Sequence, residues 1–210
     1  MSRVVFPPDL ILLLSVDIVG SAAFKADAVQ QPGPPSWVQA FEAFYTDLPA
    51  LIEQERRQLS RDGLPTADSL QLWKAIGDQL VFLARPADPH QLEGECLAFL
   101  KALRQAHRLM HERWGFGLHG VAWAFPEVGQ NMVYRFQQDQ LSGGRGFDLI
   151  GPDVDLGFRL VALAPEGELL IPLELRRLLP RQRLEVRLID EASLKGIRLD
   201  PYPVLQLQVV

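Results

Sequence analysis

The chain has 210 residues, of which 48% are hydrophobic, and its formal net charge is -5. This length predicts a single domain, residues 1–210, and the apolar fraction is enough for a full core, which excludes global disorder. The negative charge argues against a general nucleic-acid binder, and the single cysteine, Cys96, excludes an internal disulfide and a cysteine-rich zinc site. No signal peptide or membrane-spanning run is evident, so we expect a cytoplasmic protein without direct membrane association.

The first predicted element is a strand over residues 10–16, where an almost unbroken apolar run fits a strand buried on both faces. The run ends on Asp17, and Gly20 and Ser21 follow. An unpaired buried carboxylate is costly. Asp17 therefore either binds a cation, most simply a metal, or caps the next helix. Gly20 allows a tight turn that offers backbone N–H groups to an anion.

Residues 22–35 are expected to form a loop, because proline and glycine at 32–35 forbid regular structure. A helix then begins at Ser36, a residue type that favours the N-cap, and Pro49 is expected to kink this helix. One apolar face recurs at three- and four-residue steps: Trp37, Phe41, Phe44, Leu48, Leu51 and Ile52.

Two strands, Leu70–Ile76 and Gln79–Ala84, are predicted to form a hairpin, because Gly77-Asp78 is a two-residue turn signal between them. Taken alone, Asp78 is an ordinary turn aspartate. Because Asp17 also ends a strand, the two carboxylates together suit a site for divalent cations.

The rest of the chain alternates further helices and strands. Gly151-Pro152 begins a helix in which Asp155 and Arg159, four residues apart, share one face. They form either a surface ion pair or a polar pair aimed at the sugar and phosphate of a substrate. The glycine-rich stretch 142–146 lacks the Lys-Ser/Thr of a P-loop and is more typical of a hairpin tip. The other predicted elements are helices at 91–113 and 173–178 and strands at 116–124, 132–136, 168–171, 184–189 and 204–209.

Four segments in this order resemble the signature motifs of one enzyme family. They are Ser15-Val16-Asp17-Ile18-Val19-Gly20-Ser21, then Lys74-Ala75-Ile76-Gly77-Asp78, then Phe147-Asp148-Leu149-Ile150-Gly151 through Arg159-Leu160, and finally Leu194-Lys195-Gly196. Their order and spacing are similar to those of the class III nucleotide cyclases from near residue 10 to the C-terminus. The resemblance implies an α+β fold, with a ferredoxin-like β-α-β-β-α-β core and C-terminal additions.

The resemblance also implies a site. Asp17 and Asp78 would hold two divalent cations, Mn²⁺ or Mg²⁺, with the Ile18 carbonyl as a further ligand, and Gly20 and Ser21 would meet the triphosphate. Other positions match residues that act on the substrate in the family. Lys74 and Asp148 stand where adenylate cyclases read the base, Arg159 where the pentavalent phosphorus is stabilised, and Lys195 where the terminal phosphates bind.

Asp155 departs from the pattern, because most cyclases have an asparagine there that orients the ribose. A carboxylate can still accept a hydrogen bond from a ribose hydroxyl. The family works as a head-to-tail homodimer. Asp17 and Asp78 of one subunit would then face the Asp148, Asp155, Arg159 and Lys195 positions of the other.

Three segments resemble one subgroup of this family: Leu72-Trp73-Lys74, the aromatic helix 37–48 and the run from Gly151 to Arg159. These look like the pyrimidine cyclases of Pycsar antiphage systems, which make cyclic UMP or cyclic CMP, and the resemblance implies UTP ahead of CTP as substrate. Phe44 and Tyr45 either narrow the base pocket until only a single ring fits, or leave Phe44 in the core and Tyr45 merely amphipathic. Two alternatives remain: an adenylate cyclase, favoured by Lys74 with Asp148, and an inactive nucleotide-sensing domain, favoured by Asp155.

Overall fold

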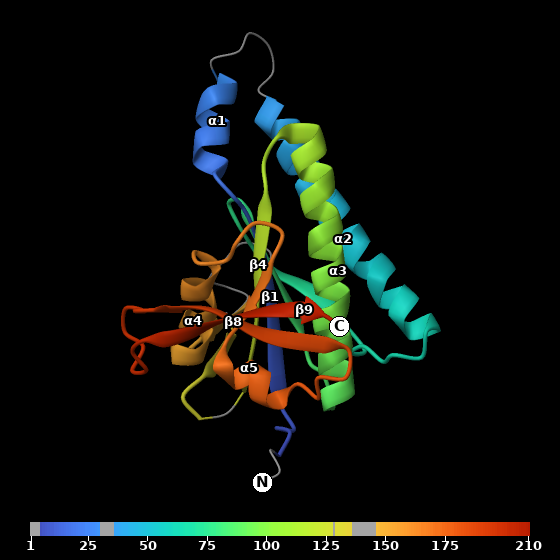
Figure 1. Ribbon diagram of the computed structural model, residues 1–210, viewed down its shortest axis with the longest axis vertical. Coiled ribbons are helices and arrows are strands. Elements are labelled where there is room, and N and C mark those ends of the chain that lie inside the picture. The colour runs from blue at the N-terminus through green and yellow to red at the C-terminus, as the bar shows by residue number, and fades with distance from the viewer. Residues whose placement is uncertain (1–4, 30–35, 128, 136–145) are drawn as a thin grey trace.

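The computed structural model describes residues 5–29, 36–127, 129–135 and 146–210. A seven-stranded sheet in the order β2-β3-β1-β4-β7-β9-β8 runs through the molecule, and β5 and β6 form a separate two-stranded sheet (Figure 1). The strands are β1 (Leu10–Ile18), β2 (Leu70–Ile76), β3 (Gln79–Ala84), β4 (Leu118–Pro126), β5 (Met132–Arg135), β6 (Phe147–Ile150), β7 (Leu169–Ile171), β8 (Leu184–Ala192) and β9 (Tyr202–Val209). The helices are α1 (Ser21–Val29), α2 (Ser36–Arg61), α3 (Pro89–Trp114), α4 (Pro152–Val161) and α5 (Leu173–Leu178).

The first four strands of the sheet form the ferredoxin-like core. They lie in the order β2-β3-β1-β4, all paired antiparallel, with α2 connecting β1 to β2 and α3 connecting β3 to β4. β7 then joins the outer edge of β4 in parallel, and β9 and β8 extend the sheet beyond it. The α+β prediction, a ferredoxin-like core with C-terminal additions, is confirmed.

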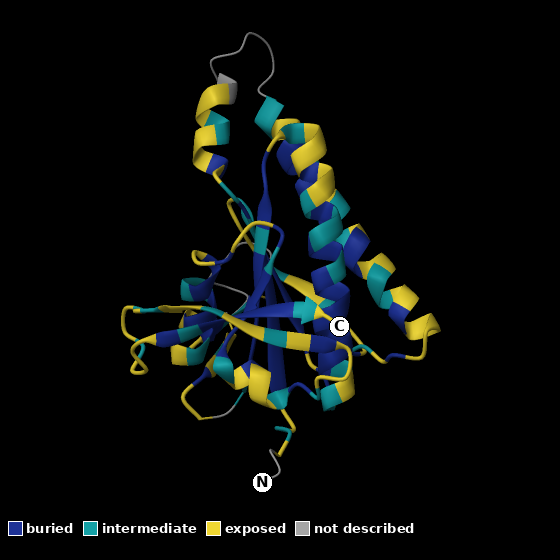
Figure 2. Cartoon of the chain, in the orientation of Figure 1, coloured by how far each residue is buried: buried dark blue, intermediate teal, exposed yellow. Residues whose placement is uncertain are grey.

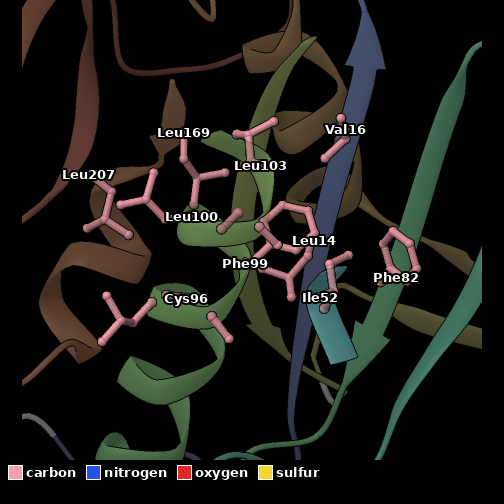
Figure 3. Packing of buried hydrophobic residues seen from close by; sticks show 14 of the residues in the cluster. Leu14, Val16, Ile52, Phe82, Cys96, Phe99, Leu100, Leu103, Leu169 and Leu207 are labelled. Atoms are coloured by element: carbon pink, nitrogen blue, oxygen red, sulfur yellow. The ribbon is translucent and has the colours of Figure 1, made fainter. Parts of the chain in front are cut away.

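β1 is buried on both faces, as its apolar run predicts, and the central strands are dark blue in Figure 2. Leu12, Leu14 and Val16 belong to the larger core cluster, on the face covered by α2 and α3. Figure 3 shows Leu14 and Val16 facing Phe99 and Leu103 of α3. Because strand side chains alternate between faces, the side chains between them point the other way, toward the smaller cluster that includes α4. Asp17 therefore lies on the α4 face of the sheet.

α4 lies unusually close to the sheet, because it has glycine at position 157. A Cβ placed on Gly157 would lie 2.1 Å from ring atoms of Trp123 in β4. The ring of Phe158 also meets Trp123 edge-on, with 5.4 Å between centroids. This contact fixes the helix that carries Asp155 and Arg159.

The structure differs from the sequence prediction at the start of the segment after β1. The expected loop over residues 22–35 is wrong in its first part, because Ser21–Val29 is helix α1. The helix breakers at 32–35 do not reach back into this segment, which contains no glycine or proline. Residues 30–35 lie outside the described part of the chain, and so does most of the glycine-rich stretch, residues 142–145. α2 is one helix across Pro49 and continues to Arg61.

Candidate active site

Asp17 and Asp78 come together at a single backbone amide. β3 pairs antiparallel with β1 so that Gln79 stands opposite Asp17, which places the hairpin tip at the end of β1. The amide N–H of Ile18 donates to Oδ1 of Asp17 at 3.0 Å and to the main-chain carbonyl of Asp78 at 3.3 Å. Two residues far apart in sequence are therefore neighbours because of strand register.

The hairpin tip is held by side chains from two helices. The hydroxyl of Ser21, the first residue of α1, donates to Oδ2 of Asp78. The hydroxyl of Tyr45 in α2 donates to the carbonyl of Gly77. Gly77 has a φ of 62°, a left-handed value that favours glycine at this turn position.

His119 is a neighbour of Asp17 that the sequence motifs do not include. It stands opposite Asp17 in β4, with 3.9 Å between its Nε2 and Oδ2 of Asp17, and its Nδ1 lies 2.6 Å from the carbonyl of Ala164. Burial lowers the pKa of His119, but the nearby Asp17 carboxylate and the contact with the Ala164 carbonyl outweigh this effect, so the pKa is raised overall. The pairing of β1 with β4 is the only signal that places it here.

Lys74 and Asp148 form a second group, between β2 and β6. Nζ of Lys74 lies 2.6 Å from Oδ1 of Asp148 and 4.5 Å from the ring centroid of Trp73. The indole N–H of Trp73 donates to the Phe147 carbonyl at 3.3 Å, and the two rings stack. Lys74 and Asp148, to which the resemblance assigns recognition of the same nucleotide base, are therefore in contact within one chain.

Asp155, Arg159 and Lys195 lie together on the α4 side of the molecule. Asp155 is exposed and Arg159 half-buried on α4, while Lys195 is exposed on the loop between β8 and β9. A Cβ at Gly196 would lie 3.8 Å from Nη2 of Arg159, so this loop passes beside the guanidinium. Within residues 5–29, 36–127, 129–135 and 146–210, none of these three side chains forms an ion pair. The surface ion pair between Asp155 and Arg159 is therefore not formed.

The burial of α2 decides between the two interpretations of Phe44. Phe44 is 0% exposed and belongs to the main core, so it does not line a ligand pocket. Tyr45 is 38% exposed and points its hydroxyl at the hairpin tip. The aromatic pair therefore does not act as one wall of a site.

The donor set around Asp17 fits hard divalent cations. It consists of the carboxylates of Asp17 and Asp78, and Mg²⁺ and Mn²⁺ prefer oxygen ligands. Across the described ranges, no group of three or more His, Cys, Asp or Glu side chains is arranged to hold a metal. Mg²⁺ characteristically takes one or two carboxylates and completes its shell with water and substrate phosphates. Two carboxylates beside the start of α1, which favours anions, match that pattern.

Comparison with known proteins places this arrangement in context. No family model and no curated protein sequence matches the chain. Among solved structures, the adenylyl cyclase CyaB from P. aeruginosa aligns with a TM-score of 0.67 and 16% identity, over 96% of this chain and 93% of that one. The chain has the fold of a class III nucleotide cyclase catalytic domain.

Two further cyclases support the same fold. The guanylyl cyclase Cya2 gives a TM-score of 0.62 with 14% identity, over 95% of this chain and 91% of that one. The guanylate cyclase domain of RhGC from Catenaria anguillulae, solved with GTP, gives 0.62 with 11% identity, over 98% of both chains. None of the helices in the described part of this cyclase-like chain is both long and apolar enough to cross a membrane.

Proposed function

We propose that this protein is a nucleotide cyclase, a phosphorus–oxygen lyase that converts a ribonucleoside triphosphate to its 3′,5′-cyclic nucleotide and pyrophosphate. The observation that carries the proposal is the meeting of Asp17 and Asp78 at the Ile18 amide, beside Ser21 at the start of α1. A carboxylate pair next to a helix N-terminus suits a metal–triphosphate complex. The cyclase fold agrees with this chemistry.

In this proposal Asp17, Asp78 and the Ile18 carbonyl hold two divalent cations, Mn²⁺ or Mg²⁺. When bound, the cations lower the pKa of the ribose 3′-hydroxyl and neutralise the phosphates. Gly20 and Ser21 contact the triphosphate through the turn and the first turn of α1. Arg159 would meet the negative charge on the oxygens of the α-phosphoryl group in the transition state, and Lys195 would meet the leaving pyrophosphate.

The site is shared between two subunits of a homodimer. Within one chain, no side-chain hydrogen bond or ion pair among the described residues joins Asp17 or Asp78 to Asp148, Asp155, Arg159 or Lys195. A head-to-tail dimer would bring the metal carboxylates of one subunit to Arg159 and Lys195 of the other. Lys74 and Asp148, already paired, would then approach the base together.

For the substrate we propose a pyrimidine triphosphate, UTP ahead of CTP. The support is the resemblance to the pyrimidine cyclases and the exposed ring of Tyr45 beside the metal hairpin. Phe44 has no part in this, since it is buried. The cyclic product would be a second messenger of antiphage defence, and its effector would be reached through that product.

The test is incubation of the purified protein with ATP, GTP, CTP or UTP and Mn²⁺, with products identified by mass spectrometry. We expect cyclic UMP as the main product. Tyr45→Ala should lower kcat/KM for UTP and raise the ATP:UTP ratio by roughly 5- to 150-fold, because an overfilled pocket costs about 1–3 kcal/mol. The neighbouring Thr46→Ala removes a hydroxyl that bonds the Glu42 and Ala43 carbonyls of its own helix, and should leave the ratio unchanged.

A wild-type enzyme that turns over ATP best would replace this proposal with an adenylate cyclase, which the Lys74–Asp148 pair favours. Turnover of none of the four triphosphates would favour the nucleotide-sensing alternative, for which the carboxylate of Asp155 at the ribose position is the argument.

A further inference from the structure

The tip of the hairpin that carries Asp78 has little packing around it, although β3 itself is buried. β2 lies at the edge of the sheet, and its Leu72 and Ile76 are 51% and 47% exposed. A Cβ placed on Gly77 would meet nothing within 4 Å. The position of the tip therefore depends on hydrogen bonds rather than on buried apolar contacts.

Two of these hydrogen bonds come from the end of β1 and the turn after it. They are the Ile18 amide to the Asp78 carbonyl and the Ser21 hydroxyl to the Asp78 carboxylate. Both involve groups that the proposed function assigns to cations or phosphates, so ligand binding will change them. Two further bonds among the described residues use groups with no such assignment: the Tyr45 hydroxyl donates to the Gly77 carbonyl, and the Gln79 side chain donates to Oγ of Ser15 at 2.8 Å. Of these two, the Tyr45 bond is made to the turn itself.

Tyr45 is suited to this task because its helix is anchored. Phe44, the residue before Tyr45, is fully buried. Phe41, one turn earlier on α2, meets the Tyr45 ring edge-on, with 6.2 Å between the ring centroids. Burial and the nearby Asp78 charge both raise the pKa of Tyr45, so its phenol stays protonated and can donate. The Tyr45 hydroxyl that donates to the Gly77 carbonyl is therefore held in place by a helix that packs into the core.

We propose that the Tyr45 hydroxyl is a positioning group for Asp78: it pins the hairpin tip through the Gly77 carbonyl and so sets the affinity for the divalent cation. This rests on the proposed function, because it takes Asp78 as a metal ligand. It assigns separate tasks to two parts of one side chain. The ring of Tyr45 borders the base, whereas its hydroxyl holds the metal hairpin.

The test compares Tyr45→Phe, which keeps the ring and removes only the hydroxyl, with Thr46→Ala as the matched control. Mn²⁺ binding is measured by electron paramagnetic resonance without nucleotide, and hydrogen exchange is followed over residues 70–84. We expect Tyr45→Phe to weaken Mn²⁺ binding by roughly 2- to 10-fold, the size of one hydrogen bond. Exchange at the tip should be faster, and the UTP:ATP ratio unchanged. Thr46→Ala should match the wild type in all three.

Wild-type Mn²⁺ affinity and wild-type exchange in Tyr45→Phe would overturn the proposal. A changed UTP:ATP ratio with unchanged Mn²⁺ affinity would overturn it in favour of a hydroxyl that reads the base. Asp78→Ala serves as the reference, since it should abolish the specific Mn²⁺ signal. If it does not, the metal site itself is wrong and the positioning role fails with it. Absence of turnover with every triphosphate, with the Mn²⁺ and exchange effects present, would instead reject only the catalytic assignment.

Discussion

At the residue scale, the candidate site depends on how two carboxylates are presented. Asp17 lies next to the end of β1, whose other residues are apolar except Ser15, and Asp78 occupies a tight turn whose glycine has a left-handed φ of 62°. Neither carboxylate belongs to the packed core, and each accepts a hydrogen bond from a nearby N–H or O–H group. Side chains oriented this way are prepared for a ligand that supplies positive charge.

The first prediction concerns these carboxylates. Asp17→Ala and Asp78→Ala should each lower turnover by about a thousand-fold or more, because a bound metal ion supplies several kcal/mol and each 1.36 kcal/mol is tenfold. Circular dichroism and thermal melting should remain near wild type, since neither side chain is in the core. Asp68→Ala, which changes an exposed carboxylate before β2, is the control. Near-full activity with Mn²⁺ in either site variant would remove that residue from the metal site.

At the element scale, α4 is the part of the candidate site most dependent on packing. It begins after Gly151, and Asp153 in its first turn accepts hydrogen bonds from the side chains of Gln130 and Asn131. Gly157 lets it lie against Trp123. The placement of Arg159 follows from that contact, because both residues are on the same short helix.

Gly157→Ala should therefore destabilise the protein by about 1–3 kcal/mol, the usual cost of overpacking a core. It should also lower activity, since α4 must move to admit the new methyl group. Intrinsic helix propensity favours alanine by about 1 kcal/mol, so it opposes this effect. Gly117→Ala is a matched control: its Cβ would lie 2.3 Å from Glu166, but that exposed carboxylate can rotate away. Equal melting temperatures for the two variants would contradict the close packing of α4.

The sequence motifs predict the strands and the turn that form this site better than they predict which side chains contact one another there. The apolar run of β1 and the Gly77-Asp78 turn are local signals, so both elements could be recognised without the structure. The sequence does not reveal α1, because the proline and glycine at 32–35 signal a loop without marking where that loop begins. Phe44 and Tyr45 are adjacent on a helix, so they face different directions, and only the structure shows which one is buried. His119 could not be placed beside Asp17, because strand pairing is non-local.

At the scale of the whole molecule, the proposed site residues fall into groups that one chain does not join. Asp17 and Asp78 lie at the end of β1, Lys74 and Asp148 between β2 and β6, and Arg159 beside the β8–β9 loop. The small sheet also exposes an apolar pair, Met132 and Ile150, which face each other across β5 and β6. Separate half-sites and exposed apolar side chains are what a subunit interface would complete and cover.

The last prediction tests that interface directly. Asp17→Ala subunits and Arg159→Ala subunits should each be inactive alone, and mixing them should restore activity. In a mixed head-to-tail dimer, one site carries both defects and the other carries neither. With equal amounts and free exchange, half of the dimers are mixed and each has one intact site, so activity should return to about a quarter of wild type. Mixing Asp17→Ala with Asp78→Ala is the control, because both defects lie in the same half-site and every mixed dimer then has two damaged sites. Subunit exchange is verified by co-purification of differently tagged chains. Verified exchange without recovery in the first pair would mean that each site is built within one chain. Equal recovery in the control pair would mean that Asp17 and Asp78 do not belong to the same half-site.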